Sequence, residues 1–463
     1  EVICGFSYAV DEALVLWINR LVDSGTLEDG RSSAESLFLE DDTVLPLIDQ
    51  FPQLSGISKK HLSMRMKVLE AFNDLYEEII HFVDLNEFHT DSLPSKLFSR
   101  RYVIFSDIKM RLWQKSLNAT AHSETNAGIK KVQIDRVKAA NSKADQDGLV
   151  FEQLRSQLTN VASWQVRPPA PSDDILTHMC FEPDMLEEMD DGGASGPYRE
   201  VFATLCNELQ SDQADLNILL RQEEDGTFVL NPRGGTPGLL QKYEFLGSLI
   251  GMALRTHVLM PLDLSEDVWK PFTHESNRVP EEPSNKTDLE LDDYPGEMVE
   301  QAAGFGGSDH DVIVDAIHVG MSRVVPTQWL RTFTWNELKW LLCGEYNIDI
   351  ELLKRHTKYH ENVDEQAQYI KWFWETLDSF TQEEKSRFVQ FAYAQPRLPG
   401  NDEEWKSTRT LRMRIMPPPQ HKSKPMKMDL VLPTAQTCFF DVHLPNYSSY
   451  EVMRRNLLRA IMS

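Results

Sequence analysis

The cysteines of this 463-residue chain are its best candidates for nucleophilic chemistry, and they lie far apart. No two of them form a CxxC pair, and their number is odd. Such a set argues against a disulfide framework and against a zinc site. A lone cysteine is most often a buried, inert side chain, and spacing alone favours that interpretation for each of them. The five are Cys4, Cys180, Cys206, Cys343 and Cys438.

Cys438 stands in surroundings that differ from this default. Pro433 and Thr434 precede it and break any helix, and an apolar, strand-like run over residues 439–444 follows it. A cysteine where a loop enters a strand can be exposed and supported by backbone N–H groups. Thioester exchange needs such an accessible sulfur, which attacks as the thiolate. The preceding residue, Thr437, is a candidate for orienting it.

The segment around Cys438 reads Leu-Pro-Thr-Ala-Gln-Thr-Cys-Phe from Leu432 and Leu-Pro-Asn-Tyr-Ser-Ser from Leu444. It resembles the active-site block of HECT-type ubiquitin ligases, which has Leu-Pro, Thr-Cys-Phe and Leu-Pro-x-Tyr-Ser-Ser at these spacings. The similarity covers about residues 97–463, and it is closest to the large HERC-type group. Further blocks in the family's order are Asp191–Gly193 with Arg199-Glu200, Phe245–Leu254, Gly320–Pro326, Glu337-Leu338, Cys343-Gly344, Thr357–Tyr359, Trp372–Trp374 and Arg397–Pro399.

The resemblance implies a ubiquitin-protein ligase in which Cys438 accepts ubiquitin as a thioester from a conjugating enzyme and passes it to a substrate lysine. The implied partners are ubiquitin, a ubiquitin-conjugating enzyme and protein substrates, with no metal or organic cofactor. The attacking lysine must lose a proton, and Asp441 is a guess for the acidic residue that helps. A basic stretch before Cys438, which includes Arg414, either supports the thiolate and ubiquitin's tail or is a solvated loop.

The resemblance also implies an α+β, bilobal fold. Residues 1–96 are expected to form an N-terminal helical extension, and residues 97–359 a mainly helical N-lobe. Residues 360–364 are the expected hinge, and residues 365–463 the small α/β C-lobe that carries the nucleophile. The sulfur must meet a loaded conjugating enzyme first and a substrate lysine second, so a hinge between the lobes is required.

The periodicity of hydrophobic residues predicts the helices and strands of these lobes. Three- and four-residue spacing of apolar side chains predicts helices, and alternation in the last part of the chain predicts strands. A short strand is also expected at Ser163–Arg167. The predicted helices include Ala9–Val22, Met64–Val83, Leu149–Val161, Leu239–Arg255 and Glu451–Met462, and the C-terminal strands are Thr408–Met416 and Cys438–His443.

Composition excludes several classes of function. The formal net charge is −25 and no basic domain is evident, so double-stranded nucleic acid is not an expected partner, whereas a basic protein is. No apolar run reaches the length of about 18–20 residues that spans a bilayer, and no signal peptide is evident. A cytoplasmic location, with the nucleus as a second compartment, is the corresponding expectation.

One stretch departs from the family's pattern. Thr287-Asp-Leu289 is followed almost at once by Asp292–Gly296, so the subdomain that docks the conjugating enzyme is expected to be shortened near residues 293–300. An alternative function is therefore a catalytically impaired, HECT-like protein that binds ubiquitin or other partners. A third is a cysteine-dependent ubiquitin hydrolase, but His443 falls on the strand face opposite Cys438 and gives it no histidine partner.

Overall fold

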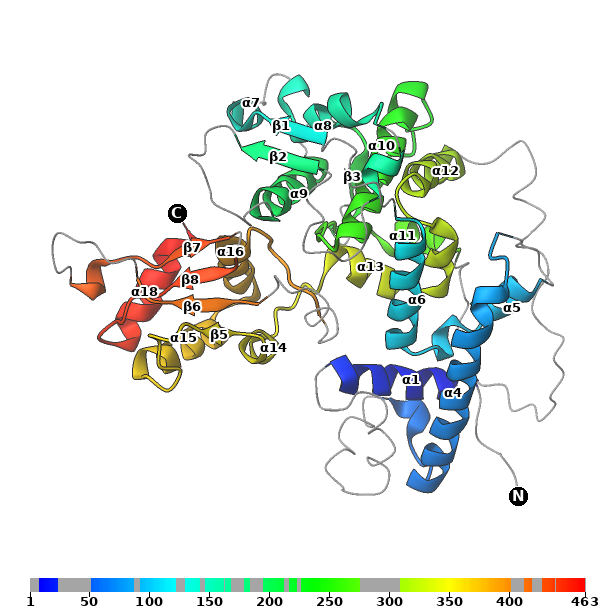
Figure 1. Cartoon of the computed structure of the whole chain (residues 1–463), viewed down its shortest axis with the longest axis horizontal. Coiled ribbons are helices and arrows are strands. Elements are labelled where there is room, and N and C mark those ends of the chain that lie inside the picture. Colours follow the sequence, from blue (N-terminus) through cyan, green and yellow to red (C-terminus); the bar gives the residue numbers. More distant parts are fainter. Residues whose placement is uncertain are drawn as a thin grey trace.

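The chain forms a group of N-terminal helices, a central helical body, and a C-terminal lobe built on a small sheet (Figure 1). The structure is a computed structural model. The α+β fold expected from the sequence is confirmed. The residues that the structure describes are 8–23, 51–86, 92–121, 130–141, 146–161, 163–167, 179–183, 195–211, 216–222, 226–274, 309–400, 412–418, 427–437 and 439–462.

The N-terminal helices share a core with the segment that follows them. Asn73 of α4 is buried, donates to the carbonyl of Val103 and accepts from the N–H of Phe105, both of which lie beyond the expected boundary at residue 96. Val103 and Phe105 also belong to the apolar cluster of these helices. The extension is therefore fused to the next segment. Its elements are α1 (Tyr8–Asp23), η3 (Pro52–Leu54), α4 (Lys59–Ile79), η4 (Ile80–Phe82), α5 (Leu93–Phe98), η5 (Arg101–Val103) and α6 (Ser106–Ala119).

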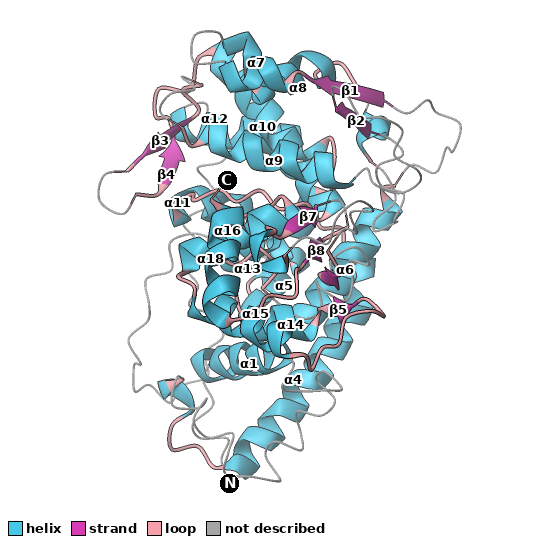
Figure 2. Ribbon diagram, turned by 90° about the vertical axis from the view of Figure 1, so that its left-hand side faces the viewer, coloured by secondary structure: helices cyan, strands magenta, loops and turns pink. Residues whose placement is uncertain are grey.

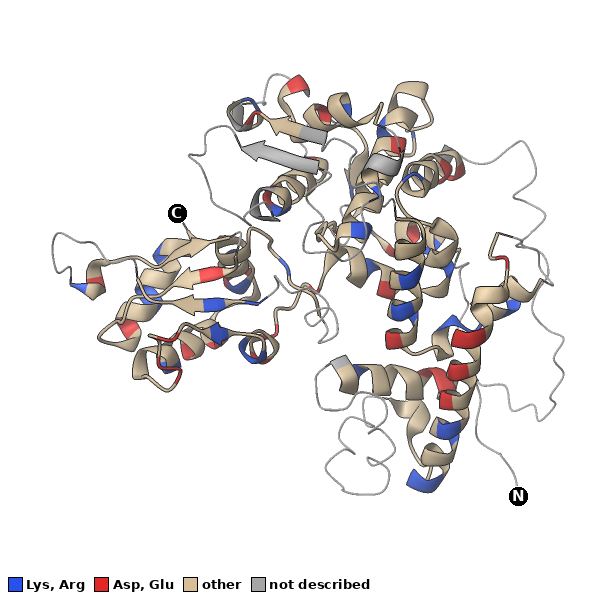
Figure 3. Ribbon diagram, viewed as in Figure 1, with Lys and Arg blue, Asp and Glu red and all other residues tan. Residues whose placement is uncertain are grey.

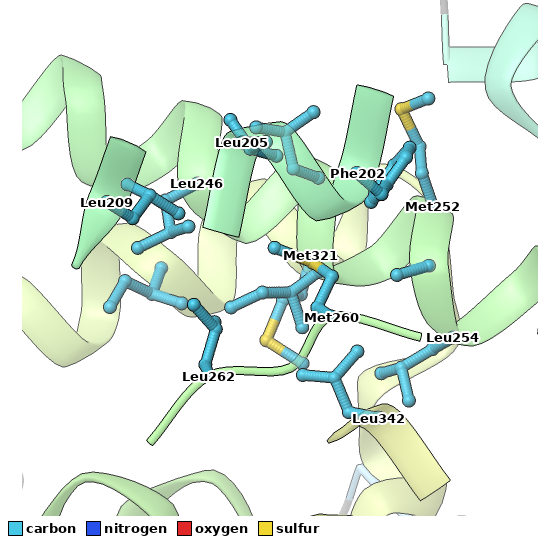
Figure 4. Close-up of a cluster of buried hydrophobic side chains, with 14 of the residues drawn as sticks. Phe202, Leu205, Leu209, Leu246, Met252, Leu254, Met260, Leu262, Met321 and Leu342 are labelled. Carbon is cyan, nitrogen blue, oxygen red and sulfur yellow. The ribbon is translucent and has the colours of Figure 1, made fainter. Parts of the chain in front are cut away.

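The central body is a helical core flanked by two two-stranded sheets. Leucine, methionine and phenylalanine side chains of α9, α10 and α12 interlock in its centre (Figure 4). The strand expected at Ser163–Arg167 is wrong, because those residues form the 3-10 helix η8. The elements are β1 (Lys130–Ile134), α7 (Arg136–Asn141), η7 (Gln146–Gly148), α8 (Val150–Leu158), η8 (Ser163–Val166), β2 (Met179–Pro183), α9 (Ser195–Leu209), β3 (Leu219–Arg221), β4 (Phe228–Leu230), α10 (Pro237–Thr256), α11 (Glu266–Phe272), α12 (Asp309–Ser322), η11 (Thr327–Thr332) and α13 (Trp335–Cys343).

Two glycines let α10 and α12 lie unusually close. A Cβ atom at Gly320 would overlap the carbonyl oxygen of Glu244, and one at Gly247 would overlap that of Ile317. The hydroxyl of Ser248 also approaches the carbonyl oxygen of Gly320 at 3.3 Å. These glycines belong to two of the sequence blocks noted above, and the contact explains why those blocks contain glycine.

The C-terminal lobe is a four-stranded sheet with helices against it (Figure 2). The strand order is β5-β6-β8-β7, with β5, β6 and β8 parallel and β7 antiparallel to β8. The predicted strand Cys438–His443 is shorter than expected, since β8 begins at Asp441. The elements are α14 (Ile350–Arg355), β5 (Lys358–Tyr359), α15 (Gln368–Ser379), α16 (Gln382–Tyr393), β6 (Arg414–Met416), η12 (Met428–Leu430), β7 (Thr434–Gln436), β8 (Asp441–His443) and α18 (Tyr450–Ile461).

The two lobes divide earlier in the chain than residues 360–364. The apolar core of the central body ends at Cys343, and that of the C-terminal lobe begins at Ile348. β5 pairs with β6 and so belongs to the C-terminal lobe, although its residues were assigned to the N-lobe. The packing boundary is therefore residues 344–347, and the expected hinge lies inside the second lobe. A hinge motion itself stays a prediction.

Candidate active site

The candidate nucleophile falls in the connection between β7 and β8. The last paired residues of this antiparallel hairpin are Gln436 and Asp441. The N–H of Phe439 donates to the carbonyl of Gln436 at 3.1 Å, and the N–H of Phe440 to that of Thr437 at 3.4 Å. The flanking residues therefore form a tight turn. Cys438 itself lies outside the described residues.

Phe440 anchors the end of this turn. Its backbone has φ 56°, in the left-handed region that a bulky residue seldom adopts. Its side chain is fully buried and lies 4.7 Å, centroid to centroid, from the ring of Tyr393. The carbonyl of Phe440 accepts from the N–H of Arg414 on β6 at 2.9 Å. Burial of the ring and the bond to β6 hold the strained backbone in place.

Arg199 reaches this turn from the central body. It lies in the first half of α9, and only 4% of it is exposed. Its Nη2 donates to the carbonyl oxygen of Thr437 at 2.5 Å, and its Nε donates to the carbonyl oxygen of Tyr393 at 3.1 Å. The guanidinium also lies 4.1 Å from the centroid of the Tyr393 ring. The residue next to Cys438 is thus held by a cation from the other lobe.

The end of α16 completes this contact between the lobes. Ala394 caps the helix with φ 62°, which turns the chain so that the buried Gln395 faces α9. The Nε2 of Gln395 donates to the carbonyl oxygen of Arg199 at 2.7 Å. Burial raises the pKa of the Tyr393 phenol, and the nearby Arg199 opposes that rise. The phenol therefore stays protonated at neutral pH.

The structure gives Asp441 a different environment from the one expected. Its buried carboxylate accepts from Arg414, with Nε–Oδ1 at 2.5 Å and Nη2–Oδ2 at 2.7 Å. Both carboxylate oxygens of Asp441 are therefore engaged by Arg414 from the neighbouring strand. Arg414 likewise is engaged with Asp441 and with the Phe439 ring, 5.8 Å away. The guanidinium of Arg414 thus contacts groups of its own lobe.

Other candidate residues are placed away from nucleophilic roles. The ring of His443 lies 2.9 Å, through Nδ1, from the carbonyl oxygen of Pro417. Cys206 and Cys343 are buried as expected. Burial raises the pKa of Cys343 to about 11 and that of Cys206 well above its ordinary value, so both stay as thiols. Within the described ranges, no group of three or more His, Cys, Asp or Glu side chains could hold a metal.

Sequence reasoning did not assign Arg199, Tyr393 or Gln395 to the site. Arg199 was noted only as part of an Arg-Glu block, and its side chain is buried against the other lobe. The Arg-Glu block was the signal that could have found it. The Asp-Gly-Gly part of that motif, residues 191–193, lies outside the described residues.

Comparison with known proteins identifies relatives for both lobes. Residues 307–463 match the sequence model of the HECT domain, described as a ubiquitin-transferase domain. The chain is 28% identical over 474 residues to the E3 ubiquitin-protein ligase HERC2 of Homo sapiens. That alignment covers 89% of this chain and 9% of HERC2. It is 25% identical over 533 residues to the probable E3 ubiquitin-protein ligase HECTD4 of Homo sapiens, covering 98% of this chain and 13% of that protein. A stretch of 148 residues is 34% identical to pub1 of Schizosaccharomyces pombe, covering 32% of this chain and 18% of that protein.

The lengths of these alignments carry further information. The chain spans only a small part of its long relatives, 9% of HERC2 and 13% of HECTD4. The alignments themselves run over 474 and 533 residues, more than the 463 residues of this chain. These relatives therefore contain residues that have no counterpart here. Among the described helices, none has both the length and the apolar character needed to cross a membrane.

Proposed function

Since residues 307–463 match the HECT domain and the chain is similar to the ligase HERC2, we propose that it catalyses ubiquitin transfer through Cys438. The observation that carries the proposal is the position of Cys438 within that domain, at the turn that Arg199 holds from the other lobe. Such a turn is built from main-chain bonds on both sides of the cysteine.

The proposed reaction has two steps. In the first, the Cys438 thiolate attacks the thioester carbonyl of ubiquitin's carboxyl terminus on the conjugating enzyme; a new C–S bond forms and the enzyme's thiolate leaves. In the second, a neutral lysine amine attacks the Cys438 thioester, an amide bond forms, and the Cys438 thiolate is released. The amine's proton passes to solvent or to a nearby base. We do not assign Asp441 as that base, because Arg414 donates to both of its carboxylate oxygens.

A non-reducing gel tests the first step. The chain incubated with a charged conjugating enzyme, or with a small-molecule thioester of ubiquitin, is expected to form an adduct that a thiol reductant removes. Cys438→Ala abolishes that adduct, whereas Cys438→Ser replaces it with an oxygen ester that resists the reductant. Cys206→Ala and Cys343→Ala leave it in place where folding survives. An adduct that persists in Cys438→Ala excludes this cysteine as the acceptor.

A second candidate function is partner binding without turnover. It is favoured by the alignments, in which relatives contain residues that this chain lacks. The expected shortening near residues 293–300 lies outside the described residues. If the docking surface for the conjugating enzyme is reduced, titration calorimetry against a panel of these enzymes gives no complex, while the small-molecule thioester still loads Cys438. A micromolar complex in that titration would remove the reason for this second candidate.

The proposal includes a location. A thioester-forming thiol must stay reduced, and the cytoplasm and nucleus keep thiols reduced. We therefore place the chain in the cytoplasm, with the nucleus as a second compartment. Microscopy of the tagged chain in its own cells tests this, and a signal confined to the secretory pathway would contradict it.

A further inference from the structure

Arg199 joins the two lobes at the one point that matters most for the proposed chemistry. A buried guanidinium requires hydrogen-bond acceptors, because burial removes its water. Here two acceptors are main-chain carbonyls of the C-terminal lobe, at Thr437 and Tyr393. The return bond from Gln395 to the carbonyl of Arg199 fixes the backbone of α9 against the same lobe. The contact exists only while the lobes are docked in this arrangement.

The docked arrangement suits the second step of the reaction better than the first. α11 and α12 flank the stretch in which the family's docking subdomain is expected. Figure 1 shows α12 on the side of the central body away from the C-terminal lobe, whereas α9 lies beside that lobe. A conjugating enzyme held near α12 is therefore far from the β7–β8 turn in this arrangement. The lobes must move apart from it for loading and return to it for transfer.

We propose that Arg199 is a positioning residue that holds the main chain before Cys438 for transfer of ubiquitin to the acceptor amine. This inference rests on the proposed function of Cys438. The carbonyl oxygen of Thr437 accepts from the Arg199 guanidinium and from the N–H of Phe440. Arg199 therefore adds a bond from the other lobe to the turn's own hydrogen bonds. Without it, the turn keeps only its internal bonds, and the thioester carbonyl loses a fixed orientation toward the amine.

Two single-turnover measurements test this. The first follows loading of Cys438 from a charged conjugating enzyme or a small-molecule ubiquitin thioester. The second follows discharge of the loaded chain to free lysine. Arg199→Ala is expected to slow discharge by about tenfold or more, because small misplacements of reacting groups are costly, and to change loading by less than about twofold. Arg199→Lys, which can serve only one carbonyl at a time, is expected to lie between. Asn207→Ala, an exposed change on the same helix, serves as the control.

The outcomes distinguish a failure of the Arg199 inference from a failure of the proposed function of Cys438. Equal loss in both steps, or a lowered melting temperature that accounts for the loss, would reduce Arg199 to a structural role. Normal discharge in Arg199→Ala would overturn the inference and leave the proposed function intact. A parent chain that loads with neither donor would overturn the proposed function instead.

A second inference comes from α4, which is apolar on two opposite faces. Its buried face contains Leu62, Met66, Leu69 and Tyr76. At about 100° per residue, the exposed side chains on the opposite face fall within roughly 60° of one another. Phe82, just past the helix, is 90% exposed. A helix buried on one side is normally polar on the other. The exposed stripe consists of Met64, Val68, Ala71, Leu75 and Phe82.

The charges beside this stripe are self-complementary. Lys60 and Lys67 lie along one edge in the first half of the helix, and Asp74 and Glu78 lie along the same edge in the second half. Figure 3 shows basic residues at one end of α4 and acidic residues toward the other. In an antiparallel pair of helices this edge meets itself, which brings Lys67 beside Glu78 of a second copy. The geometry points to an antiparallel homodimer through α4.

Sedimentation equilibrium of the whole chain tests the dimer. Met64→Glu with Leu75→Glu is expected to give a monomer, because it puts charge on the apolar seam. Lys67→Glu and Glu78→Lys should each weaken association a few-fold, as surface ion pairs do, and the double variant should restore it. Leu430→Glu, a change at a still more exposed leucine in the C-terminal lobe, is the control. A chain that is monomeric throughout, or a dimer that ignores these changes, would overturn the inference. So would a double variant that fails to recover.

Discussion

The guanidinium of Arg397 in the C-terminal lobe is paired with the carboxylate of Asp263 in the central body. Arg397 is buried, but the Asp263 side chain is half exposed, so the pair is expected to contribute no more than about 1 kcal/mol. Asp263→Asn should therefore shift the docked population by only a few-fold. Fluorescence energy transfer between labels on the two lobes measures that shift. In a double-mutant cycle with Arg397→Gln, additive effects would show that the pair does not couple the lobes.

Replacing Gly320 is expected to force α10 and α12 apart. An alanine there overlaps the backbone of Glu244, so the cost is about 1–3 kcal/mol or more in free energy of unfolding. Gly238→Ala in the first turn of α10 is the matched control, because nothing lies near its added Cβ. It is expected to stabilise the chain by about 0.5–1 kcal/mol. Urea denaturation gives the free energy of unfolding of both variants. Equal changes in that free energy would contradict the close packing of α10 and α12.

The buried Lys109 depends on Glu337. Its Nζ lies 2.8 and 2.7 Å from the two carboxylate oxygens, and burial lowers its pKa while Glu337 opposes that effect. Glu337→Gln leaves the cation buried without its counter-charge, so a loss of about 3–5 kcal/mol in unfolding free energy is expected. Lys109→Met should cost less, since it removes the buried charge. Denaturation at neutral pH measures the free energy of unfolding of both variants. A larger loss for Lys109→Met than for Glu337→Gln would show that Glu337 acts mainly as a helix cap.

Acid sensitivity is expected to depend on His257. Burial lowers its pKa in the folded chain to about 4, below the value of about 6.5 in an unfolded chain. The unfolded state therefore binds more protons, and the stabilising effect of neutral His257 is lost as pH falls from about 6.5 to about 4. His257→Asn tolerates the left-handed φ of 54° and should reduce this loss. Unfolding free energies at pH 7.5 and 4.5 test it; an unchanged difference would mean that other groups carry the effect.

The position of the hinge can be decided with two prolines. Asn347 lies on the boundary between the two cores, and Asn362 lies within the C-terminal lobe. Each donates its N–H to a nearby side chain, at 3.2 and 3.1 Å, so proline removes a comparable bond in both cases. Asn347→Pro is expected to slow ubiquitin transfer from the conjugating enzyme, and Asn362→Pro to leave it unchanged. The opposite result would return the hinge to residues 360–364.

Local signals in the sequence predicted much of this fold. The helices at α1, α4, α10 and α18 follow from apolar spacing. Gly344, with φ 68°, ends α13. The packing boundary at residues 344–347 has no comparable signal, because β5 has only two residues. β5 joins the C-terminal lobe by pairing with β6, more than fifty residues later, and no local sequence pattern predicts that pairing.

The site was predicted where one segment carries it and missed where two lobes meet. The block around Cys438 is contiguous, so its residues could be matched one by one. The role of Arg199 depends on the docking of α9 against the turn at Thr437, which no spacing along the chain encodes. The pairing of Asp441 with Arg414 could not be predicted for the same reason, since Arg414 comes from a different strand.

The fusion of the N-terminal helices to α6 decides where this chain can be cut. Asn73 bonds to the backbone at Val103 and Phe105, and Tyr76 shares a cluster with Leu97 and Ile108. A fragment that begins at residue 97 would expose these faces and lose their hydrogen-bond partners. Such a fragment is expected to be insoluble or to be digested rapidly by protease, although it would hold every residue of the proposed chemistry. The smallest soluble piece should begin no later than the start of α4.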